Sequence, residues 1–408
     1  MRTEISTLGV KKLASTLLVA SMVVSTLCAD SAIEATKVKS NLDKVDYTSA
    51  VWADAEFSEV TLYPQTTIEF NDKKANELNA NNKAIVAEIA AVYNASKIAF
   101  MIKWPDGTQS IQQADKTDTY ADGFALQFAS KYTNPTKLPY IGMGSEGRQV
   151  LVHLQKETQR TFEPNGNGNV SYQVNPNQTD LFGEDLEKFN TQVKTLGTRD
   201  YERVFVSEGF RSMTEIKDGS VQSYARSNYT GKGWEGTLSR PLKDKYVNLN
   251  AAVIPVAFAV WDGDKLGRNG LKYLSAWTAV ELDGKSGSKA LVSALHGEVK
   301  GDASKGKEAV RANCSACHQI TPYDAANLMG PSLTNIGGYS SIDYLKESLM
   351  SPSAVVVPGY NRNAHSNYAW YTIDNGKRVS AMPDFSWMSP EEIDDMVAYL
   401  KTLKVEAK

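Results

Sequence analysis

One short motif near the C-terminus constrains this chain more than any other feature. Residues 314–318 read Cys-Ser-Ala-Cys-His, the C-x-x-C-H pattern that attaches c-type haem. Two thiols at this spacing can add to the two vinyl groups of one porphyrin, and the adjacent imidazole can then bind the iron. The alternative is a chance cysteine pair of a redox or zinc site, but the flanking sequence favours haem. Cys314, Cys317 and His318 therefore predict a covalent haem c and a chain that handles electrons.

The N-terminal sequence predicts export from the cytoplasm. Basic residues precede an uncharged run over residues 13–27, and Ala29 supplies a small residue for cleavage. The run is shorter than the ~20 residues that span a bilayer, although an uncleaved anchor is one alternative and lipidation at Cys28 is another. We therefore expect a signal peptide over residues 1–29 and a mature chain without a transmembrane span. Its location would be the periplasm or an equivalent extracytoplasmic compartment, where covalent haem attachment also takes place.

Composition narrows the choice of partner. The net charge of −3 offers no electrostatic basis for binding nucleic acid, while a mildly acidic surface suits docking of another redox protein. Of the three cysteines, Cys28 leaves with the signal peptide and two bind the haem, so none remains for a disulfide. A length of 408 residues is enough for two or three domains.

A Gly- and Ser-rich stretch at residues 284–288 predicts a linker over residues 284–300 between two domains. The first domain, residues 45–283, contains short runs of strand-forming residues, of which 85–93 and 98–104 have the spacing of a hairpin. Further such runs occupy residues 123–128, 149–154 and 253–261, a loop is expected at 165–169, and helical spacing is clearest over 185–196. Many short strands with few helices indicate a β-sandwich.

The second domain, residues 301–408, has the pattern of an all-α fold. Ser389-Pro390-Glu391-Glu392 is a capping box with proline at the first helical position. Apolar residues then recur at i, i+3, i+4 and i+7 from Ile393, so the last helix has one face for a core. Another helix over residues 304–312 would deliver Cys314 to the haem edge. We therefore expect a multidomain chain in which a β-sandwich precedes an all-α domain.

A second axial ligand to the haem c iron is expected downstream of His318. Met382 is the best candidate, because it lies on a loop before the last helix and is followed by a stiffening proline. A thioether favours ferrous iron and so raises the potential. A core-filling role is the alternative for Met382, and the rival ligands are His365, Met329, Met350 and Met388.

Residues 300–404 resemble a class I, mono-haem cytochrome c. The resemblance rests on the C-x-x-C-H motif, Gly306 in the first helix, Gly330-Pro331-x-Leu333, Met382-Pro383 and Tyr399 in the last helix. In that family the glycine lets the first and last helices cross closely, against an aromatic residue. The resemblance implies an electron carrier with a closed, six-coordinate iron.

The β-rich domain carries no metal-spaced His/Cys cluster, phosphate loop or catalytic serine motif, and its His153 is expected to be structural. Two stretches are nevertheless distinctive. Residues 140–144 place Met143 between two glycines, which let a flat ligand approach the backbone. Residues 254–277 run from an apolar strand into a segment that contains Lys272 and Trp277.

These stretches, together with residues 122–126 and 234–242, resemble the haem b-binding γ subunit of the ethylbenzene dehydrogenase and dimethylsulfide dehydrogenase group. Those subunits serve periplasmic molybdenum enzymes of the dimethyl sulfoxide reductase family, and their haem b iron has Met and Lys as axial ligands. The resemblance implies a non-covalent haem b between Met143 and Lys272. A solvated turn lysine is the alternative for Lys272, and Lys243 and Lys232 are its rivals as ligand.

Together the two resemblances imply a di-haem electron-transfer subunit that is not itself catalytic. Its partners would be the iron–sulfur β subunit and the molybdopterin α subunit of a complex, and a soluble redox carrier. Because single-domain γ subunits lack a cytochrome c extension, the fused chain resembles the electron-transfer subunit of nitrite oxidoreductases. The alternatives are a free-standing periplasmic di-haem carrier and an enzyme or sugar-binding sandwich with a cytochrome c electron outlet.

Overall fold

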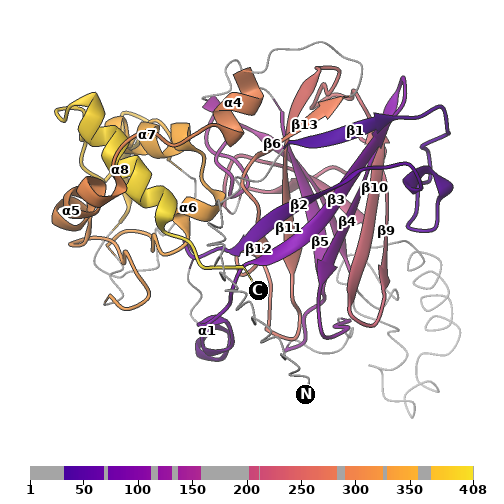
Figure 1. The fold of residues 1–408 in the computed structure, drawn as a ribbon, viewed down its shortest axis with the longest axis horizontal. Helices are drawn as coiled ribbons and strands as arrows, with labels where there is room; N and C mark the ends of the chain where they lie inside the picture. Colours follow the sequence, from indigo (N-terminus) through magenta and orange to yellow (C-terminus); the bar gives the residue numbers. More distant parts are fainter. Residues whose placement is uncertain are drawn as a thin grey trace, which may run out of the picture.

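The computed structural model describes residues 32–68, 72–111, 118–130, 137–157, 202–210, 212–282, 290–324, 329–356 and 369–407. These residues form a β-rich part followed by a helical part, which confirms the expected multidomain fold (Figure 1). The expected signal peptide at 1–29, the loop at 165–169, the helix at 185–196 and His365 lie outside the described residues.

The β-rich part is built on one hydrogen-bonded sheet of 13 described strands (Figure 1). These are β1 Ile33–Lys37, β2 Phe57–Pro64, β3 Ile85–Tyr93, β4 Lys97–Pro105, β5 Gly123–Ala129, β6 Val150–Lys156, β7 Glu202–Ser207, β8 Thr214–Glu215, β9 Tyr224–Tyr229, β10 Gly233–Pro241, β11 Val253–Trp261, β12 Tyr273–Leu274 and β13 Thr278–Leu282. The order is β8-β7-β6-β5-β11-β12-β2-β3-β4-β10-β9, and β1 pairs in parallel with β13 and β3. The hairpin expected at 85–104 is confirmed, whereas β1 lies ahead of the expected domain start at residue 45.

The sheet folds over into a sandwich, because aromatic rings from strands that are not neighbours meet inside it. Phe100 of β4 lies 5.9 Å from Phe128 of β5 and 6.3 Å from Phe258 of β11, measured between ring centroids. Trp104 of β4 and Phe124 of β5 are 5.8 Å apart in the same way. Burying each such ring contributes roughly 2–3 kcal/mol, so this core between the layers holds the sandwich together.

A polar network crosses the sandwich core and explains His153. Arg240 is fully buried, forms an ion pair with Asp244 and donates from Nη1 to His153 Nε2 at 3.2 Å. Because a guanidinium can only donate, His153 Nε2 is the acceptor, and its Nδ1 donates to Ser223 Oγ at 3.2 Å. Burial lowers the pKa of His153 and keeps it neutral. His153 is therefore structural, as its place on a strand predicts.

Two of the described helices precede the last strands of the sheet in the chain, and the others follow the sheet. The described helices are η1 Ala50–Trp52, α1 Lys73–Asn79, α4 Ala290–His296, α5 Ala303–Cys314, α6 Ile336–Tyr339, α7 Ile342–Met350 and α8 Pro390–Thr402. Ser389 and Glu392 form the expected capping box at the start of α8. The helical part also contains a two-stranded hairpin, β14 Tyr371–Asp374 with β15 Lys377–Ser380, which the helical pattern did not predict.

The first and last helices of this part cross at van der Waals distance because of one glycine. A Cβ added at Gly306 of α5 would lie 1.8 Å from the carbonyl oxygen of Asp395 in α8. Only a residue without a side chain fits there, so Gly306 sets how closely α5 and α8 approach.

Helix α4 lies within the expected linker and is packed onto the sheet. Its Leu291 is buried, and His296 Nε2 accepts a hydrogen bond from the backbone of Ala279 in β13 at 3.1 Å. Part of the 284–300 segment is therefore an ordered helix at the junction of the two parts (Figure 1).

The two parts pack against each other through contacts that are distant in sequence. Arg148 and Glu347 form a two-pronged ion pair with both distances 2.7 Å, and Asn335 donates to the Pro64 carbonyl at 3.1 Å. Among the described residues, no helix has the length and apolar character needed to cross a membrane.

Candidate cofactor sites

The C-x-x-C-H motif begins where helix α5 ends. Asp302 caps the helix start, accepting from the backbone of Ser304 and Lys305, and Cys314 is its last residue. Beyond it the chain turns tightly, since the backbone N–H groups of Cys317 and His318 both donate to the Cys314 carbonyl, at 3.1 and 2.9 Å. Two thiols and an imidazole are thereby gathered at one helix end, as covalent attachment of a porphyrin requires.

His318 is oriented so that one ring nitrogen remains available to a metal. Its Nδ1 donates to the Pro331 carbonyl at 2.7 Å, which leaves the lone pair on Nε2. Burial lowers the pKa of His318 and so favours the neutral imidazole that a metal needs. A Cβ added at Gly330 would lie 2.5 Å from His318 Cε1, so this glycine makes room for the ring.

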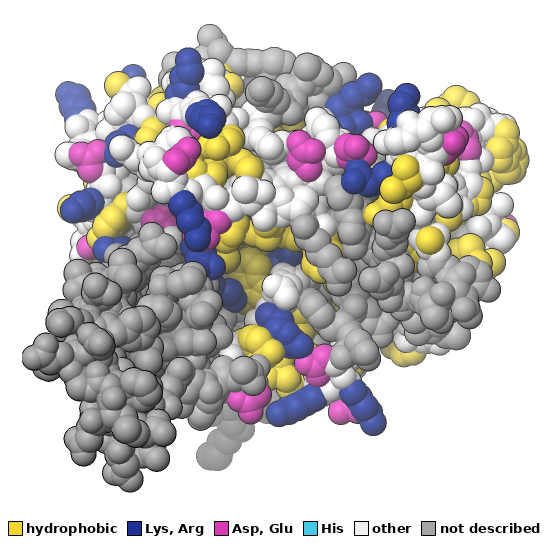
Figure 2. Space-filling model, turned by 180° about the vertical axis from the view of Figure 1, so that it is seen from behind, with side chains coloured by type: hydrophobic (Ala, Val, Ile, Leu, Met, Phe, Trp, Pro, Cys, Tyr) yellow, Lys and Arg dark blue, Asp and Glu magenta, His cyan; other side chains and the backbone are white. Residues whose placement is uncertain are grey.

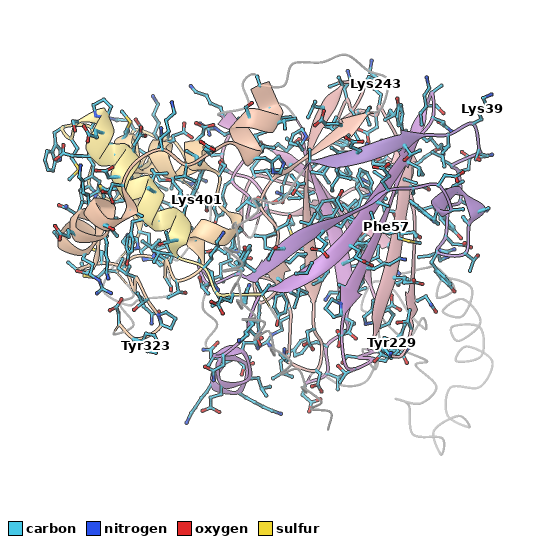
Figure 3. The ribbon with its side chains drawn as sticks, viewed as in Figure 1. Lys39, Phe57, Tyr229, Lys243, Tyr323 and Lys401 are labelled. Carbon is cyan, nitrogen blue, oxygen red and sulfur yellow. The ribbon has the colours of Figure 1, made fainter. Side chains whose placement is uncertain are left out.

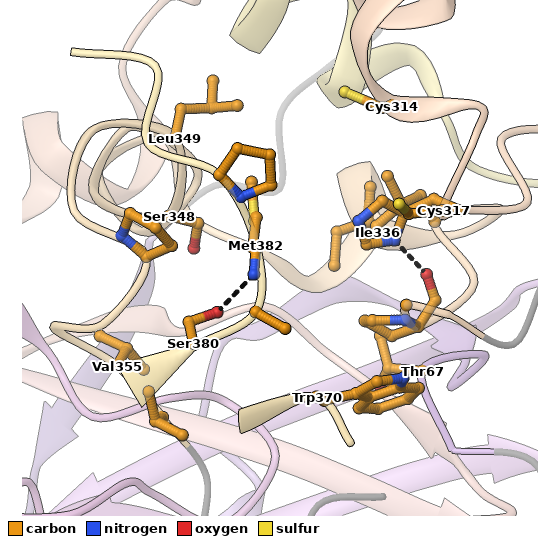
Figure 4. A pocket seen from close by; sticks show the side chains of 18 of the residues that line it. Thr67, Cys314, Cys317, Ile336, Ser348, Leu349, Val355, Trp370, Ser380 and Met382 are labelled. Carbon is orange, nitrogen blue, oxygen red and sulfur yellow. Dashed lines mark hydrogen bonds between the residues drawn. The ribbon is translucent and has the colours of Figure 1, made fainter. Parts of the chain in front are cut away.

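Met382 lines the same cavity as the motif (Figure 4). Its backbone N–H donates to Ser380 Oγ at 3.1 Å, which fixes the loop after β15. Figure 4 shows Met382 on one side of the cavity and Cys314 and Cys317 on the other. Met329 also lines the cavity but is 38% exposed. Met350 is 44% exposed, and neither it nor Met388 is among the described residues that line the cavity.

The walls of this cavity are mainly apolar and come from both parts of the chain. The helical part contributes Leu333, Ile336, Leu345, Leu349, Val355 and Phe385. The β-rich part contributes Thr67 and Tyr140. An apolar cavity with two thiols, an imidazole nitrogen and a thioether fits haem c, and the sandwich forms part of its wall.

Met143 occupies a strained position in the β-rich part. Its φ is +73° and that of Gly144 is +82°, so two consecutive residues are left-handed. Such a conformation costs a residue with a side chain about 1–3 kcal/mol and is maintained only by its surroundings. Here the Met143 carbonyl accepts from Gly209 N–H at 2.8 Å, and Gly144 N–H donates to the Tyr140 carbonyl at 2.8 Å. Met143 is thus held in a defined place, as a metal ligand must be.

Lys272 is buried, which distinguishes it from its two rivals. It is 7% exposed, and its ammonium donates to the Asn269 carbonyl at 3.3 Å and lies 5.7 Å from the centre of the Trp261 ring. Burial lowers the pKa of Lys272 to about 8. Lys232 and Lys243 are exposed, and Figure 3 shows Lys243 at the periphery of the β-rich part.

Met143 and Lys272 lie toward opposite ends of one stretch of the sheet. Gln127 of β5 donates to the Ile141 carbonyl at 3.0 Å, which ties the Met143 turn to that end. Lys272 precedes Tyr273, and Tyr273 pairs with Val260 of β11. Val260 also pairs with Phe124 of β5, so Lys272 lies near the end of the sheet marked by position 124. With a rise of about 3.3 Å per residue, positions 124 and 127 are about 10 Å apart. Two long side chains can span this separation to a metal held between them.

The surface between these two residues is suited to a flat apolar ligand. Ala125, Ala257 and Ala259 of β5 and β11 share a hydrophobic cluster with Leu274 and Trp277. All five residues are buried, and the three alanines present short side chains on this face of the sheet. Figure 2 shows hydrophobic and basic side chains together in a hollow near the middle of the rear face. The donor set of a thioether and a buried amine, with this surface, fits haem b.

Sequence reasoning missed Lys156, which lies beside the same tryptophan. Its Nζ donates to the Ala121 carbonyl at 2.9 Å and lies 4.5 Å from the centre of the Trp261 ring. Burial lowers its pKa to about 7, further than that of Lys272. In the sequence, Lys156 lies just after an expected strand, and nothing distinguishes it from an exposed lysine. Only its pairing opposite Gly123 reveals that it faces the candidate haem b site.

Three carboxylates also converge at this end of the sandwich. Oxygens of Asp106, Asp122 and Asp262 lie within 4.8 Å of one another. Burial raises the pKa of Asp106 to about 6 and that of Asp122 to about 7. Asp122 accepts from the backbone of Ser110 at 2.6 Å and Gly263 at 2.7 Å, so it fastens two loops together. Asp262 is far in sequence from Asp106 and Asp122, and the three residues carry no motif that would reveal the cluster.

Comparison with known proteins assigns a family to each part. Residues 49–273 match the ethylbenzene dehydrogenase family, and residues 303–404 match the cytochrome c family. Chlorate reductase subunit gamma of Ideonella dechloratans is 39% identical over 71 residues, which are 16% of this chain and 29% of that protein. The chain thus spans less than a third of that relative's length. Both resemblances expected from the sequence are confirmed, and the cofactors are a covalent haem c and a haem b.

Solved structures add only distant likenesses. A family 9 carbohydrate binding module of Caldicellulosiruptor kristjanssonii in complex with cellotriose is 8% identical, with a TM-score of 0.31, covering 62% of this chain and 94% of that one. A putative carbohydrate-binding protein of Bacteroides uniformis is 7% identical, with a TM-score of 0.30, covering 62% of this chain and all of that one. Likenesses this weak say nothing about function.

Proposed function

Because the chain belongs to the ethylbenzene dehydrogenase family, we propose that it is the di-haem electron-transfer subunit of an extracytoplasmic molybdopterin oxidoreductase. The observation that carries this proposal is the cavity in which Cys314, Cys317, His318 and Met382 meet and which Tyr140 of the sandwich helps to close. A haem held there by His318 and Met382 would supply one-electron chemistry and no substrate activation, because the protein would provide both ligands to its iron. The chain relays electrons and is not itself catalytic.

At the haem c site, His318 Nε2 and the Met382 thioether would hold the iron. The Pro331 carbonyl holds His318 in the tautomer that can coordinate, and the Ser380 hydroxyl holds the Met382 loop. Because the protein fixes both residues, they would stay in place when an electron arrives or leaves. A site with this property favours electron transfer over oxygen chemistry.

At the haem b site, Met143 and Lys272 would hold the iron. An amine must lose its proton to offer a lone pair to iron, and burial of Lys272 already lowers its pKa to about 8. Lys156 stays close by as a second buried amine and is the rival ligand. The strained Met143 turn supports this assignment, because strain at a methionine between glycines needs a compensating role.

The partners follow from the proposed role. An iron–sulfur subunit would exchange electrons with haem b, and a soluble redox carrier would exchange them with haem c. The molybdopterin subunit of the complex would carry the substrate, which we take to be nitrite because a cytochrome c domain is fused to the γ-like domain. An N-terminal signal over residues 1–29 would direct the chain to the periplasm.

Purification of the native complex tests this proposal. A tagged chain, isolated from the producing organism under mild conditions, should bring down an iron–sulfur protein and a molybdenum protein in equal amounts. Nitrite added to the oxidised complex should reduce both haems, while chlorate added to the reduced complex should not reoxidise them. Isolation of the chain alone with two haems would instead establish a free-standing carrier. One haem per chain would point to an enzyme or binding sandwich with a cytochrome c outlet.

A further inference from the structure

One turn of the sandwich touches both cofactor sites. The Tyr140 ring lines the haem c cavity, and Met143, three residues later, is the proposed haem b ligand. The turn is also tied to the sheet, because Trp277 Nε1 donates to the Pro139 carbonyl at 2.9 Å. Because this short segment contacts both redox sites, it is a candidate path for electrons as well as a structural element.

The Tyr140 ring is locked in place against the helical part. It is 3% exposed, lies 5.3 Å from the Tyr344 ring of α7, and its hydroxyl is 3.3 Å from Thr67 Oγ1. A Cβ added at Gly142 would lie 2.5 Å from Tyr140 Cε1, so the ring folds back over its own turn. Gly142 therefore allows Tyr140 and Met143 to share one compact turn.

The backbone of the turn provides a continuous bonded route between the two side chains. Gly144 N–H donates to the Tyr140 carbonyl at 2.8 Å, which closes the turn directly beside Met143. Tunnelling weakens steeply across gaps between atoms and less steeply along covalent and hydrogen bonds. A route made of one short turn and one aromatic ring is therefore favourable compared with a route through loosely packed side chains.

The interface next to the turn is fixed by a charged pair. Arg148 and Glu347 make two hydrogen bonds of 2.7 Å, and their side chains are only 18% and 17% exposed. A two-pronged pair with this little solvent is among the stronger and more directional polar contacts. It keeps the helical part seated on the residues that follow the turn, so the Tyr140 ring stays against the haem c cavity.

We propose that the Tyr140–Met143 turn is the path by which electrons pass between the haem b and haem c sites. The transfer moves one electron: the site that releases it is oxidised, the site that receives it is reduced, and no proton or other reactant is needed. The inference rests on the proposed ligation of haem b by Met143. Tyr140 acts as a positioning and coupling residue and does not bind iron.

The test is the rate of electron transfer between the haems in the full-length holoprotein. A light-activated reductant injects one electron, and the absorbance bands of the two haems then report its redistribution. Three variants are compared with wild type: Tyr140→Leu, which removes the ring; Tyr140→Phe, which removes only the hydroxyl; and Tyr93→Leu. Tyr93 is 2% exposed in the core of the sandwich, so its loss controls for general loosening of the fold. Haem content and the two midpoint potentials are measured for every variant.

We expect Tyr140→Leu to slow electron transfer between the haems by about an order of magnitude, because it removes the ring from the path. Both haems and both midpoint potentials should be retained. Tyr140→Phe and Tyr93→Leu should transfer at close to the wild-type rate. If Tyr140→Leu does not accumulate, Gly142→Ala replaces it, because its new Cβ displaces the ring and should slow transfer in the same way.

An unchanged rate in Tyr140→Leu or Gly142→Ala, with both haems present, would overturn the path and leave the proposed function intact. Absence of haem b from the wild-type chain would overturn the proposed function and the path together. Haem b with an unchanged spectrum in Met143→Ala would remove the ligand on which the path depends.

Discussion

Single hydrogen bonds decide which atoms of this chain are available to iron. His318 commits Nδ1 to the Pro331 carbonyl, so the coordinating nitrogen can only be Nε2. Met382 can offer only one donor atom, the soft sulfur of its thioether. The proposed pair at the haem c site is therefore one imidazole and one thioether, a combination that raises the reduction potential.

Replacing Met382 with histidine should lower the haem c potential, since imidazole stabilises ferric iron relative to a thioether. The weak absorbance at the red end of the visible spectrum, typical of ferric Met ligation, should disappear in Met382→His. Redox titration and ferric spectra measure both effects. Met329→His is the matched control, because Met329 lines the same cavity; if it alone changes band and potential, Met329 is the ligand.

Replacing Lys272 with alanine should perturb the haem b spectrum and weaken haem retention, because the iron loses its nitrogen ligand. Lys243→Ala, at an exposed lysine, should behave like wild type. Haem retention after gel filtration and the ferric spectrum report the outcome. A normal Lys272→Ala protein together with a defective Lys156→Ala protein would move the ligand to Lys156.

At the residue scale, the sequence predicts sites whose residues are close together in the chain. It does not predict sites whose residues come together only when the chain folds. C-x-x-C-H and Met-Pro carry their chemistry within a few residues, so the proposed haem c donors could be named without a structure. Lys156 has no such signal, because its burial depends on Trp261, more than a hundred residues away. The burial that separates Lys272 from Lys243 is likewise a property of the folded sheet.

Secondary-structure elements come close together at two points, and each close approach depends on one residue. Gly306 sets the distance between α5 and α8, and Asp122 ties together the loops around the ends of the strands. The first point depends on the absence of a side chain, and the second on a carboxylate kept away from water. Gly306, and Asp106 in the carboxylate cluster with Asp122, each lead to a prediction about stability.

Gly306→Ala should destabilise the helical part by about 2–3 kcal/mol, because the added methyl group overlaps the α8 backbone and forces the helices apart. Urea unfolding followed by haem c absorbance measures the loss. Lys307→Ala changes the exposed neighbour on the same helix and should shift stability by no more than about 0.5 kcal/mol. Equal stability of Gly306→Ala and wild type would mean that α5 and α8 do not cross as closely as described.

Asp106→Asn should stabilise the sandwich at pH 8 and have little effect near pH 4. Burial raises the folded-state pKa of Asp106 to about 6, above the ordinary 3.8, so the unfolded chain ionises first as pH rises. The resulting cost grows between about pH 4 and pH 6, is constant above that range, and amounts to at most about 3 kcal/mol. The asparagine avoids it and can still accept from Thr108, which bonds Asp106 Oδ1 at 3.0 and 3.1 Å.

Urea midpoints measured between pH 4 and pH 8 check this prediction, with Asp264→Asn as the exposed control. A stability gain that does not depend on pH would contradict the assignment of the effect to Asp106 ionisation.

The elements themselves were largely predictable. The hairpin of β3 and β4, the strands β5, β6 and β11, and the helices α5 and α8 occur where periodicity and capping place them. The β14–β15 hairpin and α4 were not expected, because short elements carry too few residues for a periodic pattern. Polar β14 and β15 have weak strand signals, and α4 follows a Gly- and Ser-rich stretch that indicates a linker.

The whole molecule is more integrated than a chain of two tethered domains. The Arg148–Glu347 pair, the Asn335 contact to β2 and a backbone hydrogen bond from Ala84 to the Glu406 carbonyl at 3.1 Å join residues far apart in sequence. The linker expected from the sequence did not indicate these contacts between the two parts, because sequence patterns report local structure and the contacts are long-range. One consequence is that the haem c cavity is completed by the sandwich.

The central claim is that this one chain holds two haems of different kinds. Acid–acetone extraction of the purified full-length protein, with haem measured in both fractions, tests it directly. We predict about one extractable haem b and about one retained haem c per chain, and loss of the retained haem in Cys317→Ala. A wild-type chain that retains its covalent haem but releases none into the solvent would contradict the account.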